Sequence, residues 1–168
     1  MNRRTFLTSA LAFGAFAATG AQAAAALDKG RAKSGAVGRV VKSDDEWRRL
    51  LTPEQYEVTR RKGTEAPGSS PLDKQYARGT YACVCCDLPV FSSKAKYNSH
   101  TGWPSFWQPV NKRHVREEED RSMADVRTEV LCARCDAHLG HVFDDGPEPT
   151  GLRYCMNGVA LKFVAGKA

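Results

Sequence analysis

The chain has 168 residues, a formal net charge of +6 at pH 7 and 26% charged residues. This length is typical of one modest domain, and the sequence contains no repeat of solenoid or propeller period. The positive charge is not gathered into a block of like residues, so we expect no nucleic-acid partner.

The N-terminal segment, MNRRTFLTSALAFGAFAATGAQAAAA, has the layout of a secretory signal peptide. Its pair Arg3-Arg4, followed by Thr-Phe-Leu, is typical of twin-arginine export. A membrane anchor is the alternative, but the apolar run from residue 6 to residue 18 is short and interrupted. We therefore predict a twin-arginine signal peptide over residues 1–23, cleaved near Ala23/Ala24, a periplasmic protein, and no stable membrane insertion.

Residues 24–41 are small, polar and glycine-bearing, which predicts a linker, and the domain is then expected over residues 42–168. Two helix starts open this domain. Residues 43–46 (SDDE) and 52–55 (TPEQ) both read as capping boxes, and the second has proline at the first helical position. The second helix is expected to end near Gly63.

The remainder of the chain indicates strands rather than helices. Residues 64–80, rich in Gly, Pro and Ser, predict an irregular surface segment, and the charged run Arg116–Arg121 is interpreted as a solvated loop. Short strand-like runs, separated by turn signals, cover residues 80–83, 90–92, 129–132, 141–143 and 152–164. The fold class expected is therefore mainly β, an antiparallel domain preceded by two short helices.

Four of the six cysteines form two C-x-x-C pairs, and these predict a structural zinc site with the ligands Cys83, Cys86, Cys132 and Cys135. The x-x spacing allows a tight turn to aim two thiolates at one point, and two turns complete a tetrahedron. Disulfides are the alternative, and export favours them. Twin-arginine export weakens this alternative, because that route carries proteins already folded and so allows zinc to be loaded in the cytosol.

Cys155 stands apart, inside the strand-like run RYCMNGVALKF. Strand alternation places Arg153, Cys155 and Asn157 on one face, opposite an apolar face. Arg153 favours the thiolate, and Asn157 offers a hydrogen-bond donor to a developing negative charge. A buried inert cysteine is the alternative, but its neighbours should then be apolar. The pattern favours a nucleophile.

Two further segments carry candidate functional side chains. In CDAHLGHVFDDG, His138 and His141 are left free as proton donors if the cysteines bind the metal, and a packed core histidine is an equal alternative for His138. In HTGWPSFWQP, aromatic residues crowd onto a loop. We expect Phe106 to be a core residue and Trp103 to form the wall of a pocket for a small apolar or sulfur-bearing group.

The strings GWPSFW and CxxCxAHLGHVFxDGPxPTGxRYCxN, with the paired C-x-x-C turns, resemble the methionine-R-sulfoxide reductase B (SelR domain) family over roughly residues 43–164. This family reduces one of the two epimers of methionine sulfoxide. The resemblance implies that Cys155 attacks the sulfoxide sulfur and becomes a sulfenic acid. It also implies that His141, with His138 and Asn157, binds and protonates the sulfoxide oxygen.

The resemblance further assigns the substrate methyl group to Trp103, with Phe143 in the same substrate-binding set, and the stabilisation of the thiolate to Arg153. It implies two antiparallel sheets, and a structural zinc ion distant from the catalytic cysteine. Expected partners are oxidised proteins or peptides that contain methionine sulfoxide and a thioredoxin-like or other thiol donor. The protein is expected to be a monomer.

The sequence departs from the family pattern before GWPSF, where many members carry a resolving cysteine and this chain has Thr101. The only spare cysteine is Cys85, between two presumed metal ligands. Direct reduction of the sulfenic acid by an external thiol is therefore favoured over a Cys85 disulfide. Gly158, often serine in the family, is a second and milder departure.

Two other functions remain as alternatives at this point. A zinc-ribbon interaction module would leave Cys155 buried and silent, so that Cys155→Ser would be harmless while zinc removal would not. A cysteine acyl transferase would accept an activated ester on Cys155 and consume no sulfoxide.

Overall fold

The structure is a computed structural model that describes residues 37–166, which belong to one unit, Ser34–Ala168. The predicted signal peptide and most of the predicted linker lie outside these residues. Val37 and Val40, at the end of the predicted linker, pack against the core, and the Val40 N–H donates to the Arg134 carbonyl at 2.7 Å. No helix in the described residues is long and apolar enough to cross a membrane.

Two short helices begin at the predicted capping boxes. α1 spans Asp44–Leu50 with Ser43 as its N-cap, and α2 spans Pro53–Arg61 with Thr52 as its N-cap. At both N-caps the side-chain oxygen accepts from a backbone N–H of the first turn, and the third helical residue bonds back to the cap. α2 ends at Arg61, and its C-cap Lys62 adopts a left-handed conformation with φ 59°. The predicted end near Gly63 is confirmed.

Nine strands of the described residues form two antiparallel sheets. The smaller sheet has the order β2-β1-β9 and the larger has the order β3-β4-β8-β7-β6-β5. The predicted mainly β fold with two antiparallel sheets and two helices is confirmed. The strands are β1 (Gly79–Cys83), β2 (Pro89–Ser92), β3 (Lys96–Tyr97), β4 (Ser105–Phe106), β5 (Val115–Asp120), β6 (Arg127–Cys132), β7 (His138–Phe143), β8 (Arg153–Met156) and β9 (Leu161–Ala165).

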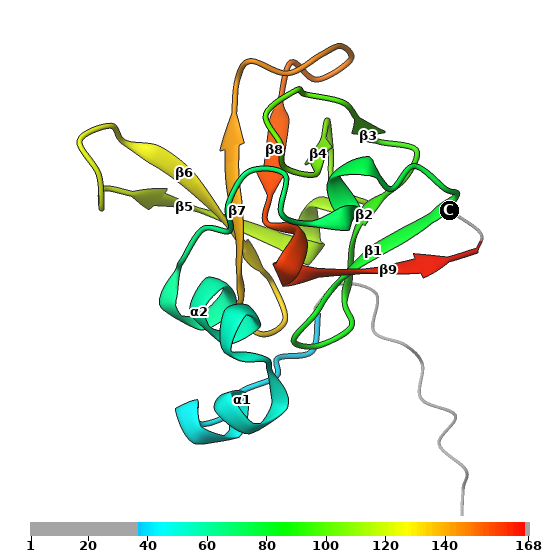
Figure 1. Ribbon diagram of the computed structural model, residues 1–168. Coiled ribbons are helices and arrows are strands. Elements are labelled where there is room, and N and C mark those ends of the chain that lie inside the picture. The colour runs from blue at the N-terminus through cyan, green and yellow to red at the C-terminus, as the bar shows by residue number, and fades with distance from the viewer. Residues whose placement is uncertain (1–36, 167–168) are drawn as a thin grey trace, which may run out of the picture. The chain divides into compact units, whose positions relative to one another are not determined.

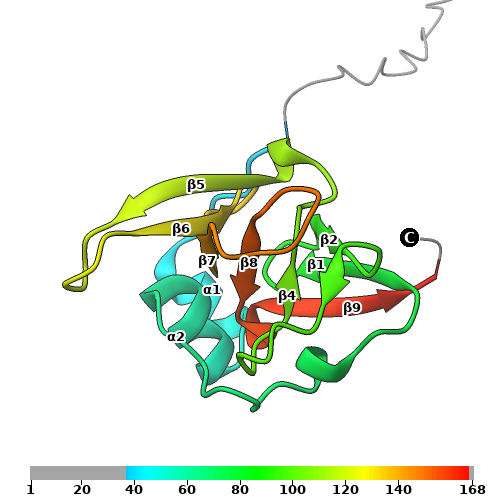
Figure 2. The ribbon, with the colours of Figure 1, turned by 90° about the horizontal axis from the view of Figure 1, so that it is seen from above.

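Three short 3-10 helices connect these elements: η1 (Pro71–Lys74), η2 (Lys112–His114) and η3 (Gly158–Ala160). In Figure 1 strands β1 and β9 of the small sheet run across the direction of β7 and β8. The helices α1 and α2 lie together at one end of the large sheet (Figure 1). Figure 2 shows the β5–β6 hairpin extending away from the small sheet. α2 packs on β7 and η3, the elements that precede and follow β8 in the sequence.

The core lies between the two sheets and is rich in aromatic rings. Tyr81 and Phe91 come from the small sheet, and Phe106 and Tyr154 come from the large one. The rings of Phe91 and Phe106 stack with centroids 4.5 Å apart, and Tyr81 meets Phe106 edge-on at 4.9 Å. These contacts are favourable beyond the area that they bury. Phe106 is fully buried, so its predicted core role is confirmed.

Two interpretations of the sequence were wrong. The charged run predicted as a loop is strand β5, at the edge of the large sheet, where the charged side chains on both faces of the strand are exposed or half-buried. The run from residue 152 to residue 164 is two strands, not one. η3 interrupts it after Asn157, and β8 and β9 belong to different sheets.

Candidate active site

A row of three polar side chains crosses the middle of the large sheet. Cys155 in β8 lies opposite Ser105 in β4 on one side and opposite His141 in β7 on the other. Gly140 lets β7 and β8 approach at this point, because a Cβ atom there would lie only 2.2 Å from the Cys155 carbonyl oxygen. The register of three strands therefore places a thiol, a hydroxyl and an imidazole next to one another.

Cys155 opens into a cavity of about 140 Å³. This cavity brings together five residues that the sequence singled out: Trp103, His141, Phe143, Cys155 and Asn157. Thr64, Arg127 and Gly140 complete its lining. Two other predicted site residues, His138 and Arg153, do not line it, so any part they play in chemistry goes through the residues that do.

The thiol of Cys155 has opposing influences around it. Burial raises the pKa of Cys155, while a hydrogen bond to Thr101 and the positive charge of Arg153 act in the opposite direction. The guanidinium of Arg153 is held by two 2.7 Å hydrogen bonds to Asp145 and lies 4.4 Å from the ring centre of Phe143. The charge of Arg153 therefore acts in favour of the thiolate, and Asp145 compensates part of that charge.

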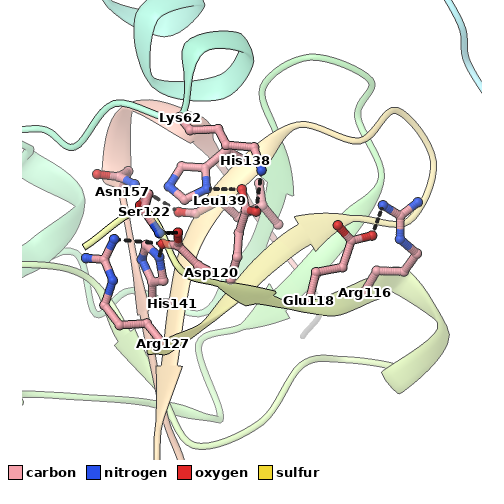
Figure 3. A network of polar contacts seen from close by, with 11 residues as sticks. Lys62, Arg116, Glu118, Asp120, Ser122, Arg127, His138, Leu139, His141 and Asn157 are labelled. Atoms are coloured by element: carbon pink, nitrogen blue, oxygen red, sulfur yellow. Dashed lines mark hydrogen bonds and ion pairs between the residues drawn. The ribbon is translucent and has the colours of Figure 1, made fainter. Parts of the chain in front are cut away.

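His141 is held by a carboxylate from the neighbouring hairpin. Its Nε2 lies 2.7 Å from Asp120 Oδ2, and Arg127 binds the same oxygen at 2.7 Å (Figure 3). Hydrogen bonds from Ser122, His141 and Arg127 hold the pKa of Asp120 well below its usual range. Asp120 is therefore ionised at neutral pH, and Nε2 of His141 must carry a hydrogen to donate to it. Nδ1 is then the ring nitrogen left for other partners.

His138 lies deeper, behind His141. Its ring is 2% exposed, and Nδ1 lies 2.7 Å from Glu129 Oε1, whose other oxygen pairs with Lys62 at 2.7 Å (Figure 3). Burial lowers the pKa of His138, and Nε2 has no hydrogen-bond partner among the described residues. The ring centres of His138 and His141 are 5.3 Å apart. This is a hydrogen-bonded core histidine that contacts the cavity through His141.

Glu65 ties together the residues on the opposite wall of the cavity. Its N–H donates to Asn157 Oδ1 at 3.0 Å, and its carbonyl accepts from the indole N–H of Trp103 at 3.1 Å. Its buried carboxylate accepts from the N–H groups of Gly158 and Val159 at 2.7 and 2.8 Å. Since the Asn157 oxygen is used, its NH₂ group is directed elsewhere, and one of the two hydrogens bonds the Leu139 carbonyl at 3.3 Å.

The glycine at position 158 has a local explanation. A Cβ atom there would lie 2.1 Å from Ser70 Oγ and 2.5 Å from Ser70 Cβ. The hydroxymethyl group of Ser70, which is the N-cap of η1, thus occupies the space that a side chain at position 158 would need. The position of Ser70 therefore accounts for the glycine at position 158.

Four other cysteines gather at the ends of two hairpins. The Sγ atoms of Cys83, Cys86, Cys132 and Cys135 all lie within 4.8 Å of one another. The first pair closes the β1–β2 hairpin of the small sheet and the second closes the β6–β7 hairpin of the large sheet. Tetrahedral zinc with about 2.3 Å Zn–S bonds needs sulfurs about 3.8 Å apart. The Cys83–Cys135 and Cys86–Cys132 separations of 3.7 and 3.5 Å fit that need, so this cluster could hold a metal ion.

The two turns of this cluster repeat each other. Each C-x-x-C is followed by an aspartate in the left-handed conformation, Asp87 with φ 62° and Asp136 with φ 56°. In each turn the N–H of this aspartate donates to the carbonyl of the first cysteine at 2.9 Å. Two copies of one turn therefore aim four thiols at a common point and join the two sheets.

Comparison with known proteins identifies the family. A family model described as the SelR domain matches residues 51–165. The chain belongs to the SelR domain family. It is similar to proteins named peptide methionine sulfoxide reductase MsrB from Hahella chejuensis (58% identity over 74% of this chain and 90% of that protein), Pseudomonas putida (54%; 74% and 94%) and Leptospira interrogans (53%; 74% and 95%). A "Yippee-like" domain of Mis18 is a distant match (20% identity, TM-score 0.42, 54% of this chain and 99% of that one).

This SelR domain contains site residues that the sequence reading missed. Thr64 and Arg127 line the cavity, and Glu65 and Asp120 hold residues that line it. Asp120 lies in the all-charged run of β5, which shows no hydrophobic alternation, and Arg127 lies just before the residues 129–132 that the sequence predicts as a strand. Nothing in the irregular segment that contains Thr64 and Glu65 indicates that it turns back to the site.

The positions of Thr101 and Cys85 bear on how this SelR domain is regenerated. Thr101 is the residue whose side chain reaches Cys155, with Oγ1 3.9 Å from Sγ. Cys85 instead lies beside the four-cysteine cluster, where hydrogen bonding with Cys135 and Cys83 lowers the pKa of its thiol. Among the described residues no cysteine side chain contacts Cys155, and all six cysteines are free of disulfides.

Proposed function

We propose that this protein is a peptide methionine-(R)-sulfoxide reductase. The observation that carries the proposal is the cavity in which a thiol, an imidazole, an amide and two aromatic rings converge, in a chain of the SelR domain family. The names of its relatives agree with this activity. In the net first step, oxygen passes from the sulfoxide sulfur, which is reduced by two electrons, to the Cys155 sulfur, which is oxidised to a sulfenic acid.

The attack requires a thiolate and a protonated oxygen. Cys155 supplies the sulfur nucleophile, favoured as thiolate by Arg153 and Thr101. His141 acts as the acid in its doubly protonated, imidazolium form: its Nε2–H donates to Asp120, and its Nδ1–H is the proton given to the sulfoxide oxygen. Asn157 donates a second hydrogen bond to that oxygen from its NH₂ group, which Glu65 fixes by occupying the amide oxygen. His138 supports the ring of His141 from behind.

The aromatic walls select the substrate. Trp103, anchored through its indole N–H, and Phe143, held beneath Arg153, provide the apolar surface for the methyl group on the sulfoxide sulfur. With the oxygen directed to His141 and Asn157, the positions of oxygen, methyl and attacking sulfur are all assigned. Only one configuration at sulfur then leaves the rest of the methionine side chain pointing out of the cavity, which is the basis of epimer choice.

Regeneration uses an external thiol donor, thioredoxin-like or a smaller thiol. Two thiols reduce the sulfenic acid to the Cys155 thiol and leave as a disulfide and water, so that atoms and electrons balance. The location of Cys85 at the metal cluster and of Thr101 beside Cys155 supports this route. Dimedone labelling after one turnover without a reductant should mark Cys155, and a disulfide in place of the label would contradict the route.

The four-cysteine cluster is proposed to hold a structural zinc ion. An all-thiolate tetrahedral site suits zinc, and a closed set of four protein ligands leaves no position for substrate. Cys83, Cys86, Cys132 and Cys135 would hold the ion, whose contribution is to stabilise the fold. Elemental analysis that finds less than one zinc per chain in protein purified without chelators would oppose this assignment.

The protein is also proposed to act in the periplasm, on oxidised proteins and as a monomer. The basis for export is the Arg3-Arg4 signal sequence, which lies before the region matched by the family model. Replacing both arginines by lysine should retain the precursor in the cytoplasm. If the double variant is still found in the periplasmic fraction, twin-arginine export is not the route.

The deciding experiment measures consumption of each epimer of a blocked methionine sulfoxide, separately, with dithiothreitol as the reductant. The R epimer alone should be consumed, and Cys155→Ser should abolish turnover without changing the thermal unfolding temperature. A folded, zinc-loaded sample that consumes neither epimer would contradict the reductase proposal and favour an interaction module. Acylation of Cys155 by an activated ester, with no sulfoxide consumed, would favour an acyl transferase.

A further inference from the structure

A chain of hydroxyl groups leads to the sulfur of Cys155. Thr101 Oγ1 lies 3.9 Å from Cys155 Sγ and 2.8 Å from Ser99 Oγ. Ser99 Oγ lies 2.7 Å from Ser105 Oγ, and Ser105 Oγ lies 3.0 Å from the carbonyl oxygen of Trp103. Three hydroxyls thus connect the reacting sulfur with the backbone of the residue that walls the cavity.

The backbone of the loop places Thr101 at the end of this chain. The residues on either side, His100 with φ 59° and Gly102 with φ 88°, both adopt the left-handed conformation. Gly102 has no room for a side chain, since a Cβ atom would lie 2.9 Å from the backbone N of Gly68, and its carbonyl accepts from that N–H at 2.7 Å. The left-handed conformations of His100 and Gly102 direct the threonine hydroxyl to Cys155, at the position where many relatives are expected to carry a cysteine.

Each hydroxyl has one hydrogen, so the chain has two possible polarities. In the first, Ser105 donates to the Trp103 carbonyl, Ser99 donates to Ser105, and Thr101 donates to Ser99, which leaves the Thr101 oxygen to accept from the Cys155 thiol. In the second, each hydroxyl donates its hydrogen in the opposite direction along the chain: Ser105 donates to Ser99, Ser99 donates to Thr101, and Thr101 donates to the sulfur. The 2.7 Å contact of Ser99 with Ser105 requires a hydrogen between the two oxygens, so the donors turn together.

We propose that Thr101 is a catalytic residue that donates a hydrogen bond to the Cys155 thiolate, and that Ser99 and Ser105 are positioning residues that turn Thr101 into a donor. No hydroxyl loses its own hydrogen in this change. The Cys155 proton leaves to water or to the sulfoxide oxygen, and the hydroxyls rotate. The Trp103 carbonyl loses the Ser105 hydrogen bond at that moment, which links the charge on sulfur to the loop that binds the substrate methyl group.

This donor has a clear task in the site. Burial disfavours the charged sulfur, and Arg153, the cation beside it, is engaged by Asp145. The other titratable groups that face Cys155 are His141 across β7 and Tyr97 in β3. His141 is bound to Asp120, and the Tyr97 hydroxyl has no hydrogen-bond partner among the described residues. Ser105 also lies beside the sulfur and favours the thiolate, but its one hydrogen is donated to the Trp103 carbonyl or to Ser99 in the two polarities. Thr101 is therefore the hydroxyl left to donate to the sulfur.

The test measures the rate of Cys155 alkylation by iodoacetamide as a function of pH, with the labelled residue identified by mass spectrometry. Thr101→Val keeps the shape and removes the donor, so the apparent thiol pKa should rise by about one to two units, the range of one charge-assisted hydrogen bond. Thr101→Ser should restore the wild-type profile. Ser99→Ala should shift the profile the same way by a smaller amount.

Thr150→Val is the matched control, because it removes a threonine hydroxyl that bonds the Trp107 carbonyl and not the sulfur. It should leave the profile unchanged. An unshifted profile in Thr101→Val would overturn the proposal. If the valine variant does not fold, an unshifted profile in Ser99→Ala would overturn it instead. The inference builds on the proposed reductase activity, but alkylation needs no substrate. Failure of sulfoxide turnover and failure of the Thr101 donor are therefore separate results.

Discussion

The protein contains two kinds of cysteine environment, and the contrast shows how neighbours decide what a thiol does. At the metal cluster four sulfurs lie within 4.8 Å of one another, held by two copies of one tight turn. Cys155 lies instead in the middle of a strand, with hydroxyls, an imidazole and a guanidinium around it, at the wall of a cavity. The same side chain is proposed to be a metal ligand in one place and a nucleophile in the other.

The physical difference is the partner that stabilises negative sulfur. Four thiolates close together repel one another, and the proposed divalent cation would offset this repulsion, so that metal binding would be coupled to folding. Cys155 has no cation of that kind, and relies on hydrogen bonds and on a partly compensated arginine. Only the environment of Cys155 therefore allows the sulfur to gain and lose its negative charge as the substrate reacts.

The largest expected effect comes from breaking the metal cluster. Cys132→Ser removes one of four ligands at the start of the β6–β7 hairpin, and should cost about 4–5 kcal/mol or more in the free energy of unfolding, the loss typical of a destroyed metal site. Thermal unfolding and zinc content would be measured together, with Cys155→Ser as the control that changes neither. A Cys132→Ser protein of unchanged unfolding temperature would contradict a structural role for the cluster.

A second change acts on the chemistry around Cys155 and should spare the fold. His141→Ala removes the proposed acid and should lower kcat for the R epimer by about 10²–10⁴-fold, the usual contribution of general acid catalysis. His114→Ala, outside the cavity, is the matched control and should retain full turnover. If His141→Ala matched the wild type across the pH range, the proton would have to come from another group.

A smaller effect is expected from the pH dependence of stability. Asp120 has a folded-state pKa depressed well below its unfolded value of about 3.9, so its pairing with His141 and Arg127 stabilises the fold fully above that pH. This stabilisation is lost progressively as the pH falls from there through the folded-state pKa, so Asp120→Asn should reduce the drop in unfolding temperature between about pH 7 and pH 2. Asp125→Asn, on the exposed turn of the same hairpin, should keep the wild-type drop.

The smallest effect is expected at Cys85, which shares a turn with metal ligands and is proposed to be neither ligand nor resolving thiol. Cys85→Ser should turn over the R epimer at the wild-type rate with dithiothreitol and with a protein thiol donor. A normal rate with dithiothreitol combined with a lost rate with the protein donor would show that Cys85 takes part in regeneration. The contrast between the two environments would then be less sharp.

Much of this fold could be predicted from local patterns. The two capping boxes, at Ser43 and Thr52, depend on residues three positions apart, and both helices begin there. The C-x-x-C turns are also local, and so is the alternation in β8 that buries Tyr154 and Met156 and leaves Arg153 and Cys155 on the other face. The mistakes came where local sequence is ambiguous, at the all-charged edge strand β5 and at the break after Asn157.

By itself the sequence determined the helices, the ligand pairs and the identity of the thiol set apart from them, because each of these is fixed by residues close together in the chain. Only the tertiary structure decided that Asp120 holds His141, that Glu65 holds Trp103 and Asn157, and that Ser99 and Ser105 support Thr101. Most of these contacts join segments that are distant in sequence or lie within an irregular loop. Strand register and loop packing create them, and no periodic pattern in the sequence records where a register or a loop will bring two side chains together.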